Sequence, residues 1–361
     1  MKRSIKAAVR LTALLGMAAA LGTAASASEP RMVAGVTCDN PPRINCPEAN
    51  CLAELSGFQG AALEPKSGRK FFLDFPCDLK PNEKVLFILN IHGAGSVGNW
   101  QRHYFPAIDG KEKYRLVVAT PTAAAPMPGR TWQAAADDQY LQDISDLVIR
   151  SFGKSNIKAF WLAGHSQGGI TSRRIVCSPY FRDKVDGYIS LSGGRVGNPT
   201  GYVRTGAAQG APGGGAPARG ATSPAAPAGR AGGVAPAAAA QPPLDCDFSY
   251  IYSQGELEGS IPATSTWADK YGCGARVRQP DIVDTQAGYV TATDQTRGPG
   301  WGRHARPGTA NVFTFPGCKG GRIVADVNRL DKGHTEGYEP KILDRILGLM
   351  ASAPGGKLRR G

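Results

Sequence analysis

The hydrophobic pattern of the chain consists of short apolar runs that alternate with amphipathic stretches. Seven runs have the length and composition of strands: residues 70–75, 85–91, 115–120, 159–163, 187–192, 248–252 and 323–327. Three stretches are typical of helices: residues 139–152, where Asp137 or Asp138 is expected to form the cap, 170–177 and 341–350. This alternation predicts a parallel sheet wrapped by helices, with a ligand site beyond the carboxyl ends of the strands.

Two segments depart from this pattern. Residues 1–27 combine a basic start, an apolar stretch and small residues at 25–27, as in a cleaved secretory signal; an uncleaved anchor is the alternative. Residues 206–243 are mostly Ala, Gly and Pro, which predicts a disordered insertion. A linker between domains is the alternative, but the strand expected at 248–252 completes the same sheet. After the signal, no segment is apolar for long enough to span a bilayer.

These segments suggest one catalytic domain at residues 66–350. A disulfide-tied N-terminal extension is expected at 28–65, with a small binding module as the alternative, and a flexible tail at 351–361. An even number of cysteines in an exported chain predicts disulfides and a secreted or periplasmic location. No metal site is expected, because Cys-x2-Cys and His-x3-His pairs are absent. The eight cysteines are Cys38, Cys46, Cys51, Cys77, Cys177, Cys246, Cys273 and Cys318.

The chain is basic, with a formal net charge of +13. Removal of residues 1–27, which carry four basic and no acidic residues, lowers this charge by four to about +9. The arginines are scattered and no segment resembles a nucleic-acid-binding module, so the charge is interpreted as a solubilising surface. Attraction to an acidic polymer or to the cell envelope is the alternative. Oligomeric state is not predicted.

The motif that organises the chain is Gly-His-Ser-Gln-Gly-Gly at 164–169. It follows a predicted strand and precedes a predicted helix, the context in which Gly-x-Ser-x-Gly forms a nucleophile elbow. Glycines permit the sharp turn, and the turn exposes the serine side chain. Ser166 is therefore the candidate nucleophile.

A serine nucleophile needs a histidine base that is oriented by a carboxylate. Of the five histidines, His334 follows the last predicted strand and fits the chain order nucleophile, acid, base; a capping or core histidine is the alternative. Glu256 and Glu258 follow the strand after the elbow unit and are the candidates for the acid, unless both are solvated loop charges.

An oxyanion hole is expected from two backbone N–H groups. The first belongs to Gln167, directly after the nucleophile, and the second to Ala94 or, as the next choice, Gly95 in the turn at 92–95. His92 is interpreted as a structural residue of that turn. Trp132 and Trp301 are possible substrate-binding residues, with packing roles as the alternative.

Together these motifs resemble the secreted α/β-hydrolase esterases of the polyhydroxybutyrate depolymerase/feruloyl esterase type, over roughly residues 70–200 and 245–350. The matching motifs are HGAG at 92–95, GHSQGG at 164–169, GELEGSIP at 255–262, WADKYGC at 267–273, CKGG at 318–321 and GHT at 333–335. The resemblance implies an α/β-hydrolase fold and places Glu258 at the acid position. The substrate it implies is a polyester or a plant-polysaccharide ester: polyhydroxybutyrate, a feruloyl ester or an acetyl ester.

Three positions depart from the family pattern. Glu258 stands where the family usually has Asp, and Gln254 stands where it usually has His. Glu336-Gly337 replaces a common Trp-Pro, which is expected to remove an aromatic wall next to the base. The resemblance also suggests a Cys273–Cys318 bridge. The predicted topology suggests Cys177–Cys246, which leaves the other four cysteines to pair in the N-terminal part.

The sequence therefore predicts a secreted serine ester hydrolase with Ser166, Glu258 and His334 as its triad. No metal or organic cofactor is required by this chemistry. A serine peptidase on the same fold and a catalytically silent envelope-binding protein are the alternatives. The sequence does not distinguish polymeric from small ester substrates.

Overall fold

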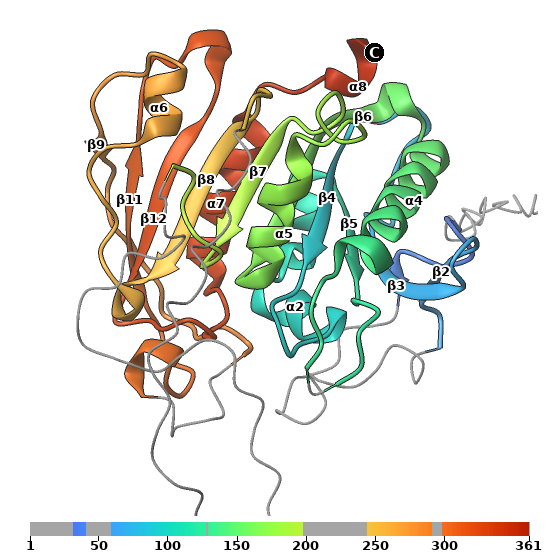
Figure 1. Ribbon diagram of the computed structural model, residues 1–361, viewed down its shortest axis with the longest axis horizontal. Helices are drawn as coiled ribbons and strands as arrows, with labels where there is room; N and C mark the ends of the chain where they lie inside the picture. Colours follow the sequence, from blue (N-terminus) through green and yellow to red (C-terminus); the bar gives the residue numbers. More distant parts are fainter. Residues whose placement is uncertain (1–31, 41–58, 128, 198–243, 291–297, 361) are drawn as a thin grey trace, which may run out of the picture. The chain divides into compact units, whose positions relative to one another are not determined.

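The computed structural model describes residues 32–40, 59–127, 129–197, 244–290 and 298–360. The predicted signal at 1–27, the predicted insertion at 206–243, Cys46 and Cys51 lie outside the described residues. The described strands form one mixed sheet (Figure 1). Its parallel centre has the spatial order β5 (Leu116–Pro121), β4 (Val85–Ile91), β6 (Ile157–His165), β7 (Gly187–Leu191), β8 (Ser249–Gly255) and β12 (Val324–Leu330).

Antiparallel strands extend the sheet at both edges. On one edge lie β3 (Arg69–Asp74) and its partners β1 (Asp39–Asn40) and β2 (Ala62–Glu64). On the other edge lie β11 (Thr309–Thr314) and its partners β9 (Val277–Arg278) and β10 (Ile282–Val283). Part of the N-terminal extension thus joins the sheet, and a Cys38–Cys77 disulfide links it to the segment after β3.

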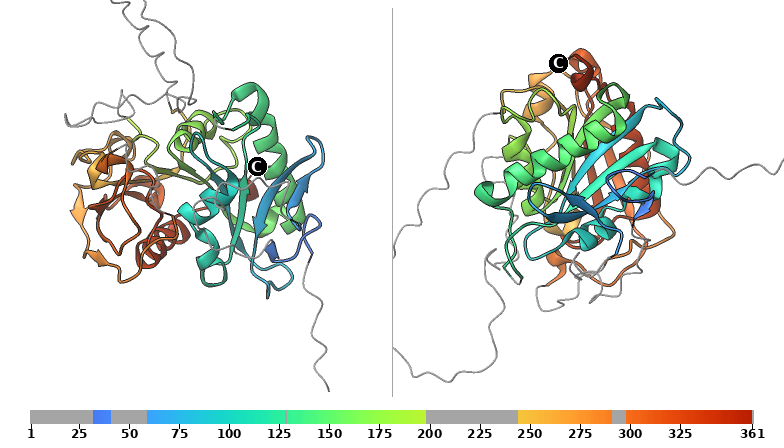
Figure 2. Two further views of the ribbon diagram at one scale, coloured as in Figure 1. Left: turned by 90° about the horizontal axis from the view of Figure 1, so that it is seen from below. Right: turned by 90° about the vertical axis from the view of Figure 1, so that its right-hand side faces the viewer.

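Helices cover both faces of the sheet (Figures 1 and 2). One hydrophobic core lies beneath α4 (Ala134–Phe152), α5 (Gln167–Val176), α6 (Thr266–Lys270) and α8 (Lys357–Arg360). The other lies beneath α2 (Gly98–Tyr104), α3 (Lys111–Tyr114) and α7 (Pro340–Ser352). In the described part of the chain, five short 3-10 turns join these elements: η2 (Ala107–Gly110), η3 (Lys154–Asn156), η4 (Glu256–Glu258), η6 (Pro299–Trp301) and η7 (Lys319–Gly321).

The central strands are apolar on both sides because each lies between two layers of helices. β4 is buried at every position, and so are β7 and β8. The strand order, with the serine turn between β6 and α5, is that of the α/β-hydrolase fold, as predicted. None of the described helices is both long and apolar enough to cross a membrane.

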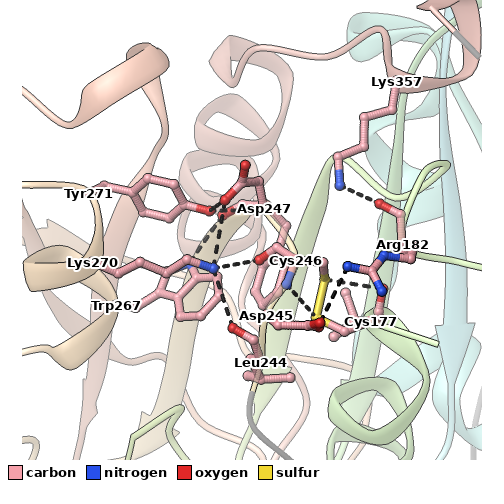
Figure 3. The surroundings of a disulfide bond; sticks show 12 residues. Cys177, Arg182, Leu244, Asp245, Cys246, Asp247, Trp267, Lys270, Tyr271 and Lys357 are labelled. Carbon is pink, nitrogen blue, oxygen red and sulfur yellow. Dashed lines mark hydrogen bonds and ion pairs between the residues drawn. A yellow bond between two sulfur atoms is a disulfide. The ribbon is translucent and has the colours of Figure 1, made fainter. Parts of the chain in front are cut away.

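Two of the predicted disulfides are confirmed, Cys177–Cys246 and Cys273–Cys318. Cys177 ends α5, and Cys246 precedes β8 on the side where Lys270 donates hydrogen bonds to the carbonyls of Leu244 and Cys246 (Figure 3). The bridge therefore joins the two segments on either side of residues 198–243.

Two elements differ from the prediction. α4 begins at Ala134 rather than near 139, and Asp137 accepts a hydrogen bond from the N-cap N–H of Gln133 at 2.8 Å instead of capping the helix itself. Residues 353–360, expected to be part of a flexible tail, form α8 and its linker. Leu358 is buried, and the Lys357 N–H donates to Asp186 at 3.0 Å, which fastens this segment to the core.

Candidate active site

Four side chains of the candidate site follow four neighbouring parallel strands. Ser166 follows β6, Ser192 follows β7, Glu258 lies in η4 directly after β8, and His334 follows β12. These strands end at the same edge of the sheet. His165 of β6 pairs with Leu191 of β7, Leu191 pairs with Ser253 of β8, and Gly255 of β8 pairs with Arg329 of β12. The carboxyl edge of the sheet therefore gathers residues that lie up to 168 positions apart in the chain.

Ser166 occupies a strained turn. Its φ of 50° and ψ of −118° lie in a region that non-glycine residues rarely adopt, as is typical of a nucleophile elbow. Its own N–H donates to the Leu191 carbonyl at 2.8 Å. Gly168 makes the turn possible, because a Cβ there would lie 2.3 Å from the Ile91 carbonyl oxygen of β4. The backbone of the elbow therefore lies in close contact with β4, the strand that leads into the turn at 92–95, called the oxyanion turn below.

The predicted oxyanion donors lie on both sides of this contact. α5 begins at Gln167, so the backbone N–H of this residue is among the helix N–H groups that lack an intrahelical partner. Ala94 is exposed in the facing turn. The Gly95 N–H donates to the Arg130 carbonyl at 2.7 Å, which favours Ala94 over Gly95 as the second donor.

Trp132 fastens the elbow to the facing turn. Its backbone N–H and carbonyl both bond the side-chain amide of Gln167 at 2.9 Å, and its indole N–H donates to the His92 carbonyl at 2.8 Å. The side chain is only 5% exposed. Of the two roles that the sequence left open for Trp132, this geometry favours packing.

His92 is a structural residue in this arrangement. Its Nδ1 bonds the Gly93 carbonyl at 2.7 Å, and its Nε2 accepts the Ala123 N–H at 3.0 Å. Complete burial lowers the pKa of His92 to about 3. The ring is therefore neutral near pH 7.

The predicted acid and base form a direct hydrogen bond. Nδ1 of His334 lies 2.6 Å from Oε2 of Glu258, with both side chains almost buried. The other carboxylate oxygen accepts hydrogen bonds from the Ser192 hydroxyl at 2.7 Å and from the Gly255 N–H at 2.8 Å. Glu256 is exposed and accepts the Asp331 N–H at 3.0 Å. Of the two candidates, Glu258 is therefore the one that faces the imidazole.

The loop of His334 is also bonded through its backbone. The His334 N–H donates to the Gly300 carbonyl at 3.0 Å, and the Thr335 N–H donates to the Trp301 carbonyl at 2.9 Å. The half-buried Trp301 ring lies edge-on to the His334 ring, with centroids 5.0 Å apart. Trp301 thus places an aromatic ring next to His334 from another segment, although Glu336-Gly337 lacks the Trp of the family pattern.

A buried charge cluster lies beneath the same loop. Arg329 and Lys332 form ion pairs with the two carboxylate oxygens of Glu339, at 3.0 Å and 2.7 Å. Arg329 also donates to the carbonyls of Glu336 and Gly337, both at 2.7 Å. All three charged side chains are at most 2% exposed. Burial raises the pKa of Glu339, but Arg329 and Lys332 outweigh it and the net shift is downward.

Sequence reasoning did not identify Ser192 or Arg329 as parts of the site. Ser192 is the last residue of the strand predicted at 187–192, and this position at a carboxyl strand end was a usable signal. Arg329 gave no such signal, since a basic residue next to a loop is normally solvated.

Two further features of the described residues bear on ligands. No group of three or more His, Cys, Asp or Glu side chains there is arranged to hold a metal ion. A cavity of about 390 Å³ lies beside the acid turn, lined among others by Glu256, Arg276, Asn311, Phe313 and Asn328. Ser166 and His334 do not line it, so this cavity is not the site of the triad.

Comparison with known proteins gives matches among solved structures, all with low sequence identity and low TM-scores. No protein-family model and no curated protein matches the chain. An acetyl xylan esterase from Aspergillus awamori is 11% identical, with a TM-score of 0.42, over 79% of this chain and 94% of the esterase.

Two other solved structures match over a shorter region. A fluorophosphonate-binding serine hydrolase F from Staphylococcus aureus is 18% identical, with a TM-score of 0.27, over 34% of this chain and 51% of that protein. A feruloyl esterase module from Clostridium thermocellum is 19% identical, with a TM-score of 0.28, over 34% of this chain and 49% of that module. The chain spans about half the length of these two proteins.

Proposed function

We propose that the protein is a serine carboxylic-ester hydrolase that uses Ser166, Glu258 and His334. The observation that carries this proposal is the His334–Glu258 hydrogen bond of 2.6 Å at the strand edge that also bears the strained Ser166. An imidazole that donates Nδ1–H to a carboxylate presents the Nε2 lone pair as its proton acceptor. This is the protonation state that a general base needs.

In the proposed reaction, Ser166 Oγ attacks the ester carbonyl carbon while His334 Nε2 accepts the hydroxyl proton. Glu258 stabilises the imidazolium that forms, and Ser192 and the Gly255 N–H hold this carboxylate in place. The N–H groups of Gln167 and Ala94 donate to the oxyanion of the tetrahedral intermediate.

Collapse of the intermediate breaks the bond to the alcohol, which leaves with the proton from His334. Water then attacks the acyl-enzyme, His334 accepts the proton of this water, and the free acid departs as Ser166 regains its proton. The chemistry needs only side chains and backbone groups of this chain.

The substrate is proposed to be an ester of a polymer or plant polysaccharide: polyhydroxybutyrate, a feruloyl ester or an acetyl ester. The motifs that resemble the esterase family support this class, and Trp301 beside His334 is consistent with an aromatic acyl group. A secreted or periplasmic location is proposed with it, because the three disulfides of the described residues suit an oxidising compartment.

The test is hydrolysis of short p-nitrophenyl esters by the wild type and by matched variants. Ser166→Ala is expected to lower kcat by about 10³-fold or more, whereas replacement of the exposed Ser155 by Ala leaves it unchanged. Glu258→Gln is expected to lower kcat by roughly 10³–10⁴-fold, by analogy with the loss of a triad carboxylate, and Glu256→Gln to leave it within a few-fold. Turnover retained by a folded Ser166→Ala variant contradicts the proposal.

A panel of substrates then identifies the acyl group and the molecule to which it is esterified. Polyhydroxybutyrate, a feruloylated oligosaccharide, an acetylated oligosaccharide and a peptide are each given to the wild type and to Ser166→Ala. Serine-dependent release from one of the three esters assigns the substrate class. Release from the peptide alone contradicts an esterase.

A further inference from the structure

His165, the residue before the nucleophile, contacts the base as well. Its Nε2 lies 2.9 Å from the backbone carbonyl oxygen of His334. A carbonyl oxygen only accepts hydrogen bonds, so Nε2 carries the proton and donates it. His165 is the chain neighbour of Ser166, so its side-chain hydrogen bond links the elbow to the backbone of His334.

The rest of the His165 ring is enclosed by the site. The side chain is 4% exposed, and its ring centroid lies 4.1 Å from that of Tyr104 and 5.1 Å from that of Trp100. On the Nδ1 side lies Gly93 of the oxyanion turn, where a Cβ would come within 2.6 Å of Nδ1. His165 thus touches the oxyanion turn on one side and the loop of the base on the other.

Nδ1 of His165 has no hydrogen-bond partner among the described residues, although it is fully buried. A buried nitrogen without a hydrogen-bond partner destabilises the folded state. An apolar side chain of similar volume would avoid that cost, so packing alone does not explain a histidine here. Burial also shifts the pKa of His165 well below its usual value, which keeps the ring a neutral Nε2–H donor.

We infer that His165 is a positioning residue for the proposed reaction. Its Nε2–H holds the backbone of His334 at a fixed distance from the elbow and thereby sets the approach of the imidazole to Ser166 Oγ. This role rests on the proposed function, since it acts through His334. Tyr104 gives weaker support to the same carbonyl, because its hydroxyl lies 3.3 Å away.

The test compares variants that keep or remove the donor. Gln places its side-chain N–H close to the position of Nε2, whereas Leu fills the space without a donor. His165→Leu is expected to lower kcat for a p-nitrophenyl ester by about 100-fold, the loss that a misplacement of about 1 Å produces, with KM nearly unchanged. His165→Gln is expected to recover most of this loss, and Tyr104→Phe to cost less than ten-fold.

Controls separate positioning from stability. The exposed His304 is replaced by Leu and by Gln, and both variants are expected to keep wild-type kcat. Thermal unfolding is measured for every variant. Equal loss of kcat in folded His165→Leu and His165→Gln, or an unchanged kcat in His165→Leu, overturns the inference, because then the donor does not matter.

A spectroscopic readout covers the case in which the proposed function itself fails. The proton between His334 Nδ1 and Glu258 gives a far-downfield NMR signal when the pair is well ordered. His165→Leu is expected to broaden or shift this signal, and His165→Gln to restore it. An unperturbed signal in His165→Leu contradicts the positioning role, whereas absent turnover in the wild type with these signals as expected contradicts only the esterase assignment.

Discussion

The two halves of the candidate site are held by different forces. The nucleophile half, formed by the turns after β4 and β6, depends on close approach of backbones: Gly168 lies where any Cβ would meet Ile91. The acid–base half, formed by the turns after β8 and β12, has such a contact too, because a Cβ on Gly255 would lie 2.2 Å from the Lys332 carbonyl oxygen. It adds buried charges, since Arg329 and Lys332 both pair with Glu339. The first half is restrained by volume, and the second by volume and electrostatics.

This difference has consequences for how each half responds to change. A steric restraint does not depend on pH, but it does not tolerate an added methyl group. A restraint built from buried charges fails when one partner is removed or neutralised. The two halves should therefore be separable by experiment.

The largest effect is expected from an added methyl group in the nucleophile half. Gly168→Ala would place a Cβ 2.3 Å from the Ile91 oxygen and 2.5 Å from that of His92, so strand and elbow must separate. We expect a loss of activity of about 100-fold or more and a destabilisation of about 3 kcal/mol, measured by ester hydrolysis and urea unfolding.

Gly348→Ala in the middle of α7 is the matched control. The new methyl group would lie 3.4 Å from the Tyr114 hydroxyl and 4.0 Å from its ring carbon Cζ, which is ordinary van der Waals contact. Because Gly weakens a helix interior, this variant is expected to be as stable as the wild type or up to about 1 kcal/mol more stable. Equal behaviour of the two variants would contradict the steric restraint.

The next effect concerns the charge cluster. Arg329→Met removes one partner of Glu339 and leaves the carbonyls of Glu336 and Gly337 without their buried donor. The free energy of unfolding is expected to fall by roughly 3 kcal/mol, with a smaller loss of kcat than in Gly168→Ala.

The exposed Lys113–Asp344 pair supplies the comparison for this change. Lys113→Met is expected to change the free energy of unfolding far less than Arg329→Met does, because water screens an exposed pair. Destabilisation of the same size in both variants would show that burial of the Arg329 charge does not matter.

The smallest effect is the dependence on pH that the Glu339 carboxylate gives to the acid–base half. The pKa of Glu339 is lowered in the folded state, so its stabilising contribution is fully present above about pH 4.5 and is lost as pH falls through the folded pKa. Below pH 4.5, the unfolding free energy of Glu339→Gln should fall less steeply than that of the wild type. The two slopes should differ by at most about 1.4 kcal/mol per pH unit, the value for one proton. Parallel slopes would contradict the stabilising role of the Glu339 charge.

The candidate site shows what a single sequence can and cannot predict. The elbow was predictable because its signal is local: the glycines and Ser166 lie within six consecutive residues. The choice between Glu256 and Glu258 needed the family resemblance, because both occupy the same turn. The partnership of Ser192 with Glu258 spans 66 residues and that of His165 with His334 spans 169, so only the folded chain reveals them.

The fold was predictable to a similar degree. The apolar central strands and the long α4 and α7 gave clear patterns, and they determine the architecture. α2 is polar in sequence yet mostly buried, which conceals its helical period. The strands β1, β9 and β10 have two residues each, too few to show an alternation.

The Cys177–Cys246 bridge has a practical consequence for the proposed enzyme. A break introduced anywhere in residues 198–243 would divide the polypeptide into one piece that carries Ser166 and another that carries Glu258 and His334. The bridge would still join the two pieces covalently, since one of its sulfurs belongs to each. On a denaturing gel, nicked protein should therefore migrate as a single species without reductant. With reductant it should separate into two fragments, one with the nucleophile and one with the acid and base.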